Sequence, residues 1–131
     1  MEYAIEFSRD PPGVTFTTSG PADLSTILRA NDEFLSDPRF RPGMRVLADH
    51  SDLDTTSLAS SDTELIGKAY RRFLDKVGQS AIAIVVAHPA TFGLVRMAQA
   101  HAGQPQPHQR IFYSRAEAIS WLNRPVGGSP A

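Results

Sequence analysis

The run Ala81–Ala87, seven consecutive apolar residues followed directly by His88-Pro89, constrains the fold more than any other stretch of the chain. It is too short to span a bilayer, because a transmembrane helix needs about 20 apolar residues. A strand that is apolar on both faces is typical of the centre of a parallel sheet covered by helices on each side. Since proline suits the first turn of a helix, the run predicts a central strand that leads into a helix beginning at Pro89.

Strand-like and helix-like stretches alternate along the rest of the chain. The motif Asp10-Pro11-Pro12-Gly13 is a strong turn signal between two alternating stretches, which predicts an N-terminal β-hairpin. Strands that alternate with helices after this hairpin predict a mostly parallel sheet with right-handed crossovers. The expected class is therefore α/β, a mixed five-stranded sheet flanked by four helices. Strands are expected near residues 3–7, 14–17, 44–49, 81–87 and 111–113, and helices near 22–36, 61–77, 89–102 and 114–122.

Two motifs mark where helices begin. Ser61-Asp62-Thr63-Glu64 and Ser114-Arg115-Ala116-Glu117 both fit the capping box, in which the serine hydroxyl bonds an amide near the glutamate. Gly78 is the expected end of the helix that Ser61 begins. In the last helix, Ile119 and Leu122 are expected to face the core.

Length and composition narrow the functional classes. A chain of 131 residues fits one domain, expected over 1–123, followed by a flexible tail at 124–131. The 13 basic and 14 acidic residues give a net charge of −1, which argues against a general nucleic-acid binder. The absence of cysteine excludes a disulfide framework and a thiol nucleophile. Since the N-terminus shows no signal-peptide pattern and no apolar run is long enough for a membrane span, a cytoplasmic protein is expected.

Three segments carry a resemblance to a known fold. The first is DPRFRPG followed by the predicted strand MRVLAD, the second is IAIVVAHPATFGLVRMAQAHA, and the third is IFYSRAEAISWL. In this order they resemble the STAS/SpoIIAA-like fold, which is also related to the Sec14 (CRAL-TRIO) lipid-binding core. More narrowly, the chain is similar to the uncharacterised bacterial SpoIIAA-like family, and the likeness covers roughly residues 2–123. The resemblance implies a single-domain SpoIIAA-like fold with an N-terminal β-hairpin followed by β-α repeats.

The same resemblance implies a place for a regulatory phosphorylation. In anti-sigma-factor antagonists of this fold, the loop after the equivalent strand carries a phosphorylatable serine in an Asp-Ser-Ser-Gly context. The corresponding stretch here is Asp54-Thr55-Thr56-Ser57-Leu58, which lacks that pattern. Ser57 is the candidate position, and a phosphorylation-controlled switch is one of the functions left open.

Polar residues follow several predicted strands at the place where a parallel sheet would hold a ligand. In open parallel sheets, ligands bind beyond the carboxyl ends of the strands, and helix N-termini at that edge favour anions. Asp49 and His50 follow one strand end, His88 follows a second and Ser114 a third. Side chains from distant parts of the sequence are therefore expected to converge at this edge. The candidate ligand-binding residues are Asp49, His50, Ser51, Thr55, His88, Phe92 and Ser114.

The preferred interpretation is a non-enzymatic module that binds a partner protein or a small, partly apolar or anionic ligand, lipid-like ligands included. The alternative is a hydrolase or phosphoryl-transfer enzyme that uses Asp49 and His50 as acid and base, assisted by a divalent metal. Asp52, Asp54 and His88 would supply further ligands to that metal. Because no close ligand spacing such as H-E-x-x-H is present, neither a metal site nor a cofactor is predicted.

The same candidate residues could instead have purely structural roles, and this alternative is left open. Asp49 would bond loop amides, and His50 would be exposed in a polar loop after the strand. Leu94 and Met97 point away from the expected core face of their helix. They would line an apolar pocket or a homodimer surface, unless the C-terminal segment covers them.

Overall fold

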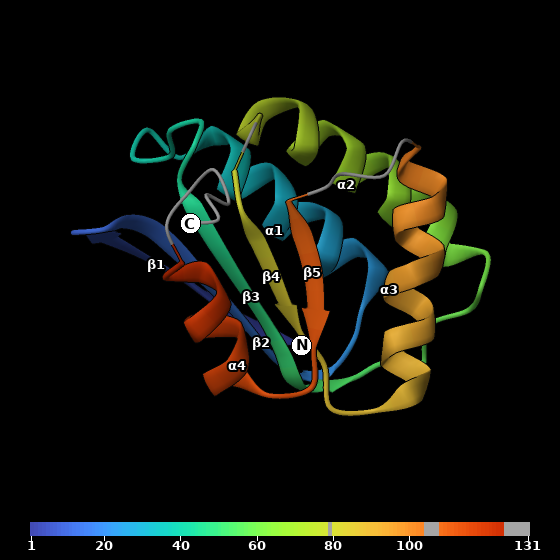
Figure 1. Ribbon diagram of the computed structural model, residues 1–131. Coiled ribbons are helices and arrows are strands. Elements are labelled where there is room, and N and C mark those ends of the chain that lie inside the picture. Colours follow the sequence, from blue (N-terminus) through green and yellow to red (C-terminus); the bar gives the residue numbers. More distant parts are fainter. Residues whose placement is uncertain (79, 104–107, 125–131) are drawn as a thin grey trace.

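The computed structural model describes residues 1–78, 80–103 and 108–124 and confirms the predicted α/β order of strands and helices (Figure 1). Within these ranges the strands are β1 (Glu2–Arg9), β2 (Pro12–Pro21), β3 (Arg45–Asp54), β4 (Ile82–Val85) and β5 (Gln109–Phe112), and the helices are α1 (Leu24–Ser36), α2 (Asp62–Val77), α3 (Pro89–Ala102) and α4 (Arg115–Leu122). The strands form one mixed sheet in the order β1-β2-β3-β4-β5. Strands β1 and β2 are antiparallel and the other neighbours are parallel. The predicted tail at 124–131 lies outside the described residues apart from Arg124.

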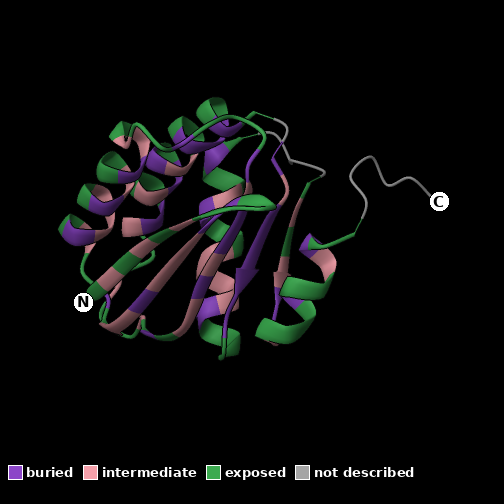
Figure 2. Cartoon of the chain, turned by 90° about the vertical axis from the view of Figure 1, so that its left-hand side faces the viewer, coloured by how far each residue is buried: buried purple, intermediate pink, exposed green. Residues whose placement is uncertain are grey.

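The two faces of the sheet are covered by different helices. Along β3, Val46 belongs to the core under α1, α2 and α3, whereas the next residue, Leu47, belongs to the core under α4. The larger core includes Phe34 from α1 and Phe73 from α2, and the smaller one includes Leu122 from α4. Figure 2 shows buried residues running along the central strands between these layers. This two-sided covering explains why β3 and β4 are rich in apolar residues on both faces.

Strand β3 continues to Asp54, so the prediction of a polar loop after Asp49 is wrong. The polar residues stay in the strand because the second half of β2 runs beside them, where Gly20 pairs with Leu53 and Pro21 with Asp54. Backbone hydrogen bonds to this neighbour outweigh the low strand propensity of the acidic residues.

A β-bulge lies in this added part of β3. One residue of β2, Thr18, is opposite two residues of β3, His50 and Ser51. The extra residue shifts the two-residue alternation of side chains along the strand. As a result, His50 and Leu53 both face the side of α1–α3, although three positions separate them.

The predictions for helix ends had different outcomes. Ser114 caps α4 as predicted, since its hydroxyl accepts a hydrogen bond from the amide of Glu117 at 3.2 Å. The prediction of a capping box at Ser61 is wrong, because Ser61 has helical backbone angles and its side chain makes no capping bond. Asp23 caps α1, for which the sequence analysis predicts no cap, and its carboxylate accepts a hydrogen bond from the amide of Thr26 at 3.1 Å. The inward orientation predicted for Ile119 is also wrong, because Ile119 is 39% exposed.

Helices α2 and α3 cross closely at a glycine. A Cβ atom on Gly67 would lie 2.5 Å from the Cβ of His101 and 2.9 Å from the carbonyl oxygen of Ala98. Gly78 ends α2 as predicted, with a φ of 63° that favours glycine. The close crossing holds α3 against α2 and over the sheet.

Candidate functional site

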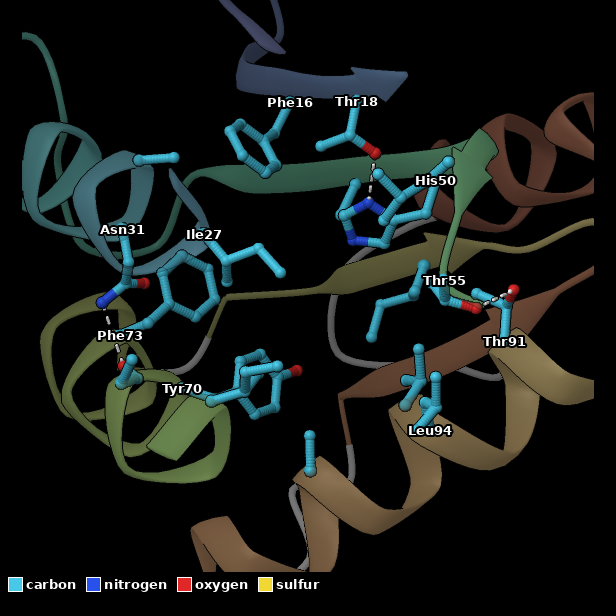
Figure 3. A pocket seen from close by; sticks show the side chains of 18 of the residues that line it. Phe16, Thr18, Ile27, Asn31, His50, Thr55, Tyr70, Phe73, Thr91 and Leu94 are labelled. Carbon is cyan, nitrogen blue, oxygen red and sulfur yellow. Dashed lines mark hydrogen bonds between the residues drawn. The ribbon is translucent and has the colours of Figure 1, made fainter. Parts of the chain in front are cut away.

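A cavity of about 200 Å³ lies between the sheet and helices α1, α2 and α3 (Figure 3). Its floor is formed by β2, β3 and β4, where Phe16, Ala48 and Ile84 are paired neighbours across the strands. The helices add apolar side chains to its walls, among them Ile27 from α1 and Leu94 from α3. The walls are therefore mainly hydrocarbon.

Polar side chains border the cavity without bringing a charge into it. Among the described residues that line the cavity, none is Asp, Glu, Lys or Arg. The amide of Asn31 donates to the carbonyl oxygen of Ala69 at 3.1 Å, and the hydroxyl of Tyr70 donates to the side-chain oxygen of Gln109. Burial raises the pKa of Tyr70, so its phenol is neutral under ordinary conditions.

His50 is a half-buried polar side chain on the β3 part of the cavity floor (Figure 3). Its Nδ1 lies 2.8 Å from Oγ1 of Thr18, and the same hydroxyl lies 3.4 Å from the carbonyl oxygen of Asp49. The ring of Phe16 packs edge-on against the imidazole, with centroids 6.1 Å apart. Burial lowers the pKa of His50 to about 4 against the opposing effect of the Asp49 carboxylate, so the imidazole is neutral at neutral pH.

The segment that follows β3 borders the same cavity. The hydroxyls of Thr55 and Thr91 are 3.1 Å apart, which joins this segment to the first turn of α3 (Figure 3). The hydroxyl of Ser57 donates to the carbonyl oxygen of Ala22 at 2.8 Å, which joins the segment to the start of α1. Thr55 is therefore part of the cavity wall, and the hydroxyl of Ser57, the candidate phosphorylation position, bonds a neighbouring loop.

Asp49 and Ser51 lie on the opposite face of the sheet, beneath α4. The Asp49 carboxylate accepts hydrogen bonds from the guanidinium of Arg115 at 2.7 Å, the hydroxyl of Ser51 at 2.6 Å and the amide of Ser51 at 3.0 Å. Burial acts to raise the pKa of Asp49, but the bonds from Ser51 and Arg115 outweigh it and hold this pKa below its usual value. The sheet therefore separates Asp49 and Ser51 from His50, because side chains alternate across it.

The other candidates lie beyond the ends of β4 and β5. His88 is exposed at the start of α3 and makes no capping bond. Phe92 packs against the larger core and stacks on Tyr113, with ring centroids 5.8 Å apart. Of the predicted ligand-binding residues, the structure thus brings His50 and Thr55 together at the cavity.

Asp54, an acidic residue after the bulge, bonds the backbone and hydroxyl of a neighbouring residue. The amide and hydroxyl of Thr56 donate to Asp54 at 3.0 and 2.7 Å, and these bonds lower the pKa of Asp54. Within 1–78, 80–103 and 108–124, no group of three or more His, Asp or Glu side chains is placed to hold a metal ion.

The sequence analysis does not identify several of the residues that line the cavity, among them Thr18, Tyr70 and Thr91. The two-residue spacing of Phe16 and Thr18 is a signal that both face one side of the sheet. That spacing does not distinguish a filled core from an open cavity. Leu94 lines the cavity, which was one of the alternatives for its helix face.

A search of solved structures finds similarity to an uncharacterised protein of the DUF3478 family with a SpoIIAA-like fold, from Shewanella loihica PV-4. The two share 22% sequence identity, with 92% of each chain covered and a TM-score of 0.54. This likeness shows that the present chain has a SpoIIAA-like fold, whereas the link to the Sec14 core stays a prediction. No protein-family model and no curated protein matches the sequence. Across the part of the chain that the structure describes, no helix combines the length and the apolar character needed to cross a membrane.

Proposed function

We propose that this SpoIIAA-like chain is a binding module that holds a small apolar ligand in the cavity between the sheet and α1–α3. One observation carries the proposal: the cavity has a volume of about 200 Å³, and its lining is apolar apart from neutral polar groups. Ligand sites are typically concave and mostly apolar, with a small number of placed polar groups. Since protein interiors contain few voids larger than a water molecule, an opening of this size in a small domain suits an occupant.

The arrangement of Asp49 and His50 favours binding over acid–base catalysis. An acid and a base that act on one substrate must both reach it within hydrogen-bond distance. Asp49 is bonded to Arg115 under α4, whereas His50 borders the cavity on the other face of the sheet. The acid and the base that the enzymatic alternative needs therefore lie on opposite faces of the sheet, although they are adjacent in β3.

Binding of a partner protein, or of a second copy, is a weaker candidate. Its support is that Leu65, Met97, Tyr113 and Ile119 are exposed among the described residues. Single exposed apolar side chains are common on protein surfaces, so this support is modest. A cytoplasmic location is also part of the proposal, in keeping with the absence of cysteine.

The proposal is tested by an NMR titration of the ¹⁵N-labelled protein with p-xylene, an uncharged probe. We expect saturable shifts at amides around the cavity, including those of Ala48 and Leu94. The Ala48→Leu variant puts an isobutyl group into the cavity and should abolish them. The Ala4→Leu variant, which makes the same change at an exposed position of β1, should retain them. Wild-type spectra without saturable shifts, or shifts that persist in Ala48→Leu, would refute the proposal.

A further inference from the structure

We infer that the ligand of this cavity is an uncharged molecule that carries a hydroxyl group, and that this hydroxyl bonds Nε2 of His50. The inference rests on the proposed function and adds the chemical class of the ligand. It follows from the charge of the lining, the hydrogen bonds that the lining already makes, and the volume of the cavity.

The side chains of the lining disfavour a charged ligand. No acidic or basic side chain borders the cavity among the described residues, so an ionised carboxylate or ammonium inside it would have no side chain of opposite charge as a partner. Burying an unpaired ion in apolar surroundings is strongly unfavourable. A neutral ligand avoids this cost.

Most polar groups around the cavity already have partners within the protein. The hydroxyls of Thr55 and Thr91 bond each other and the hydroxyl of Tyr70 bonds Gln109. The Nδ2 group of Asn31, on the α1 wall, donates to a backbone carbonyl, while its Oδ1 has no partner among the described residues. In His50, Nδ1 bonds Thr18, while Nε2 has no hydrogen-bond partner in the described part of the chain. A ligand that reaches the floor of the cavity therefore meets one ring nitrogen that is open to a hydrogen bond.

A hydroxyl group suits both protonation forms of the neutral imidazole. When the Thr18 hydroxyl donates to the Asp49 carbonyl, it accepts from Nδ1–H, and Nε2 is then an acceptor. When the hydroxyl donates to Nδ1, the ring proton is on Nε2, which is then a donor. An alcohol or phenol both donates and accepts, so it bonds Nε2 in either case, whereas a ketone or ether bonds in only one.

The volume sets the size of the ligand. An engineered cavity of about 150 Å³ in another protein binds benzene, so a cavity of about 200 Å³ holds on the order of eight non-hydrogen atoms. Small phenols and short alcohols are of this size. Long-chain lipids exceed it unless they extend out of the cavity.

The experiment compares three probes of related shape by calorimetry at neutral pH: p-cresol, p-xylene and benzoate, each with the wild type and with His50→Phe. The phenylalanine keeps a ring beside Phe16 but removes both nitrogens. We expect the ratio of p-cresol to p-xylene affinity to fall about tenfold in the variant, because the buried hydroxyl loses its partner. Benzoate should show no binding to either protein.

Each outcome separates this inference from the proposed function. If p-xylene binds but the affinity ratio is the same in both proteins, or if benzoate binds as well as p-cresol, the inference is overturned and the proposed function stands. If none of the probes binds the wild type, the proposed function fails. Should His50→Phe not fold, the ¹⁵N resonance of His50 Nε2 in the wild type decides, because p-cresol must shift it strongly and p-xylene must not.

Discussion

Mild acid should destabilise this protein, because His50 is neutral in the folded state. Burial lowers the pKa of His50 to about 4 from its usual 6.5. Between these values the unfolded chain binds a proton that the folded chain does not, so the free energy of unfolding falls as the pH falls. At about 1.4 kcal/mol per pKa unit, the loss in the free energy of unfolding levels off below pH 4 at about 3.5 kcal/mol, and about 2 kcal/mol of it is already lost between pH 7 and pH 5.

Urea unfolding followed by circular dichroism at pH 7, 6 and 5 measures this loss. Carboxyl groups of an unfolded chain titrate near pH 4, below this window, so their contribution is small. His50→Phe lacks the titrating ring and should lose far less stability over the same range. A wild-type loss below about 0.5 kcal/mol, or an equal loss in the variant, would refute the reasoning from burial.

Three further predictions concern the fold and use the same urea assay. Gly67→Ala should destabilise the protein by about 1–3 kcal/mol, because the added Cβ would lie 2.5 Å from a side-chain carbon of α3. Gly93→Ala should stabilise the protein by about 0.5–1 kcal/mol, because a Cβ there would meet no atom within 4 Å. Equal effects of the two changes would contradict the close helix crossing. Ser114→Ala should lower the free energy of unfolding by about 1 kcal/mol and Ser61→Ala by almost nothing, since the Ser114 hydroxyl accepts a capping bond and that of Ser61 does not. A larger loss for Ser61→Ala would be inconsistent with the caps described. Arg115→Met should lower the free energy of unfolding by about 1 kcal/mol, because the buried carboxylate of Asp49 loses its cation. The loss is moderate because the arginine side chain is 48% exposed. Unchanged stability would show that the bonds from Ser51 are enough to hold the carboxylate.

The architecture was predictable because its strongest signals are local. The apolar run around β4, the proline that begins α3 and the turn motif between β1 and β2 each indicate an element without knowledge of its neighbours. The order of these elements then limits the sheet to a mostly parallel arrangement. Element type and topology therefore followed from patterns within short stretches.

The second half of β3 was not predictable for a physical reason. Its residues are polar, and the bulge opposite Thr18 breaks the two-residue alternation that marks a strand. The stretch is a strand because β2 continues beside it and pairs with it. This pairing is a tertiary contact between residues that are distant in the sequence. The bulge also decides which side chains reach the cavity, so the same limitation affects the site.

The location of the candidate site was partly predictable. His50 and Thr55 were expected at the carboxyl end of the strands, and both border the cavity. The sequence did not reveal that Asp49 and Ser51 would face α4 and bond Arg115, because the partner lies 66 positions away from Asp49. The cavity itself is an absence of packing between distant residues, and no local pattern encodes it.

Native mass spectrometry of the protein isolated from its own cells, with the Ala48→Leu variant beside the wild type, tests the central claim most directly. We predict a non-covalent adduct on the order of 100 Da on the wild type, as the cavity volume implies. The adduct should disappear on denaturation and be missing from Ala48→Leu. The bare chain mass for both proteins, or the same adduct on both, would contradict a ligand-binding role for this cavity.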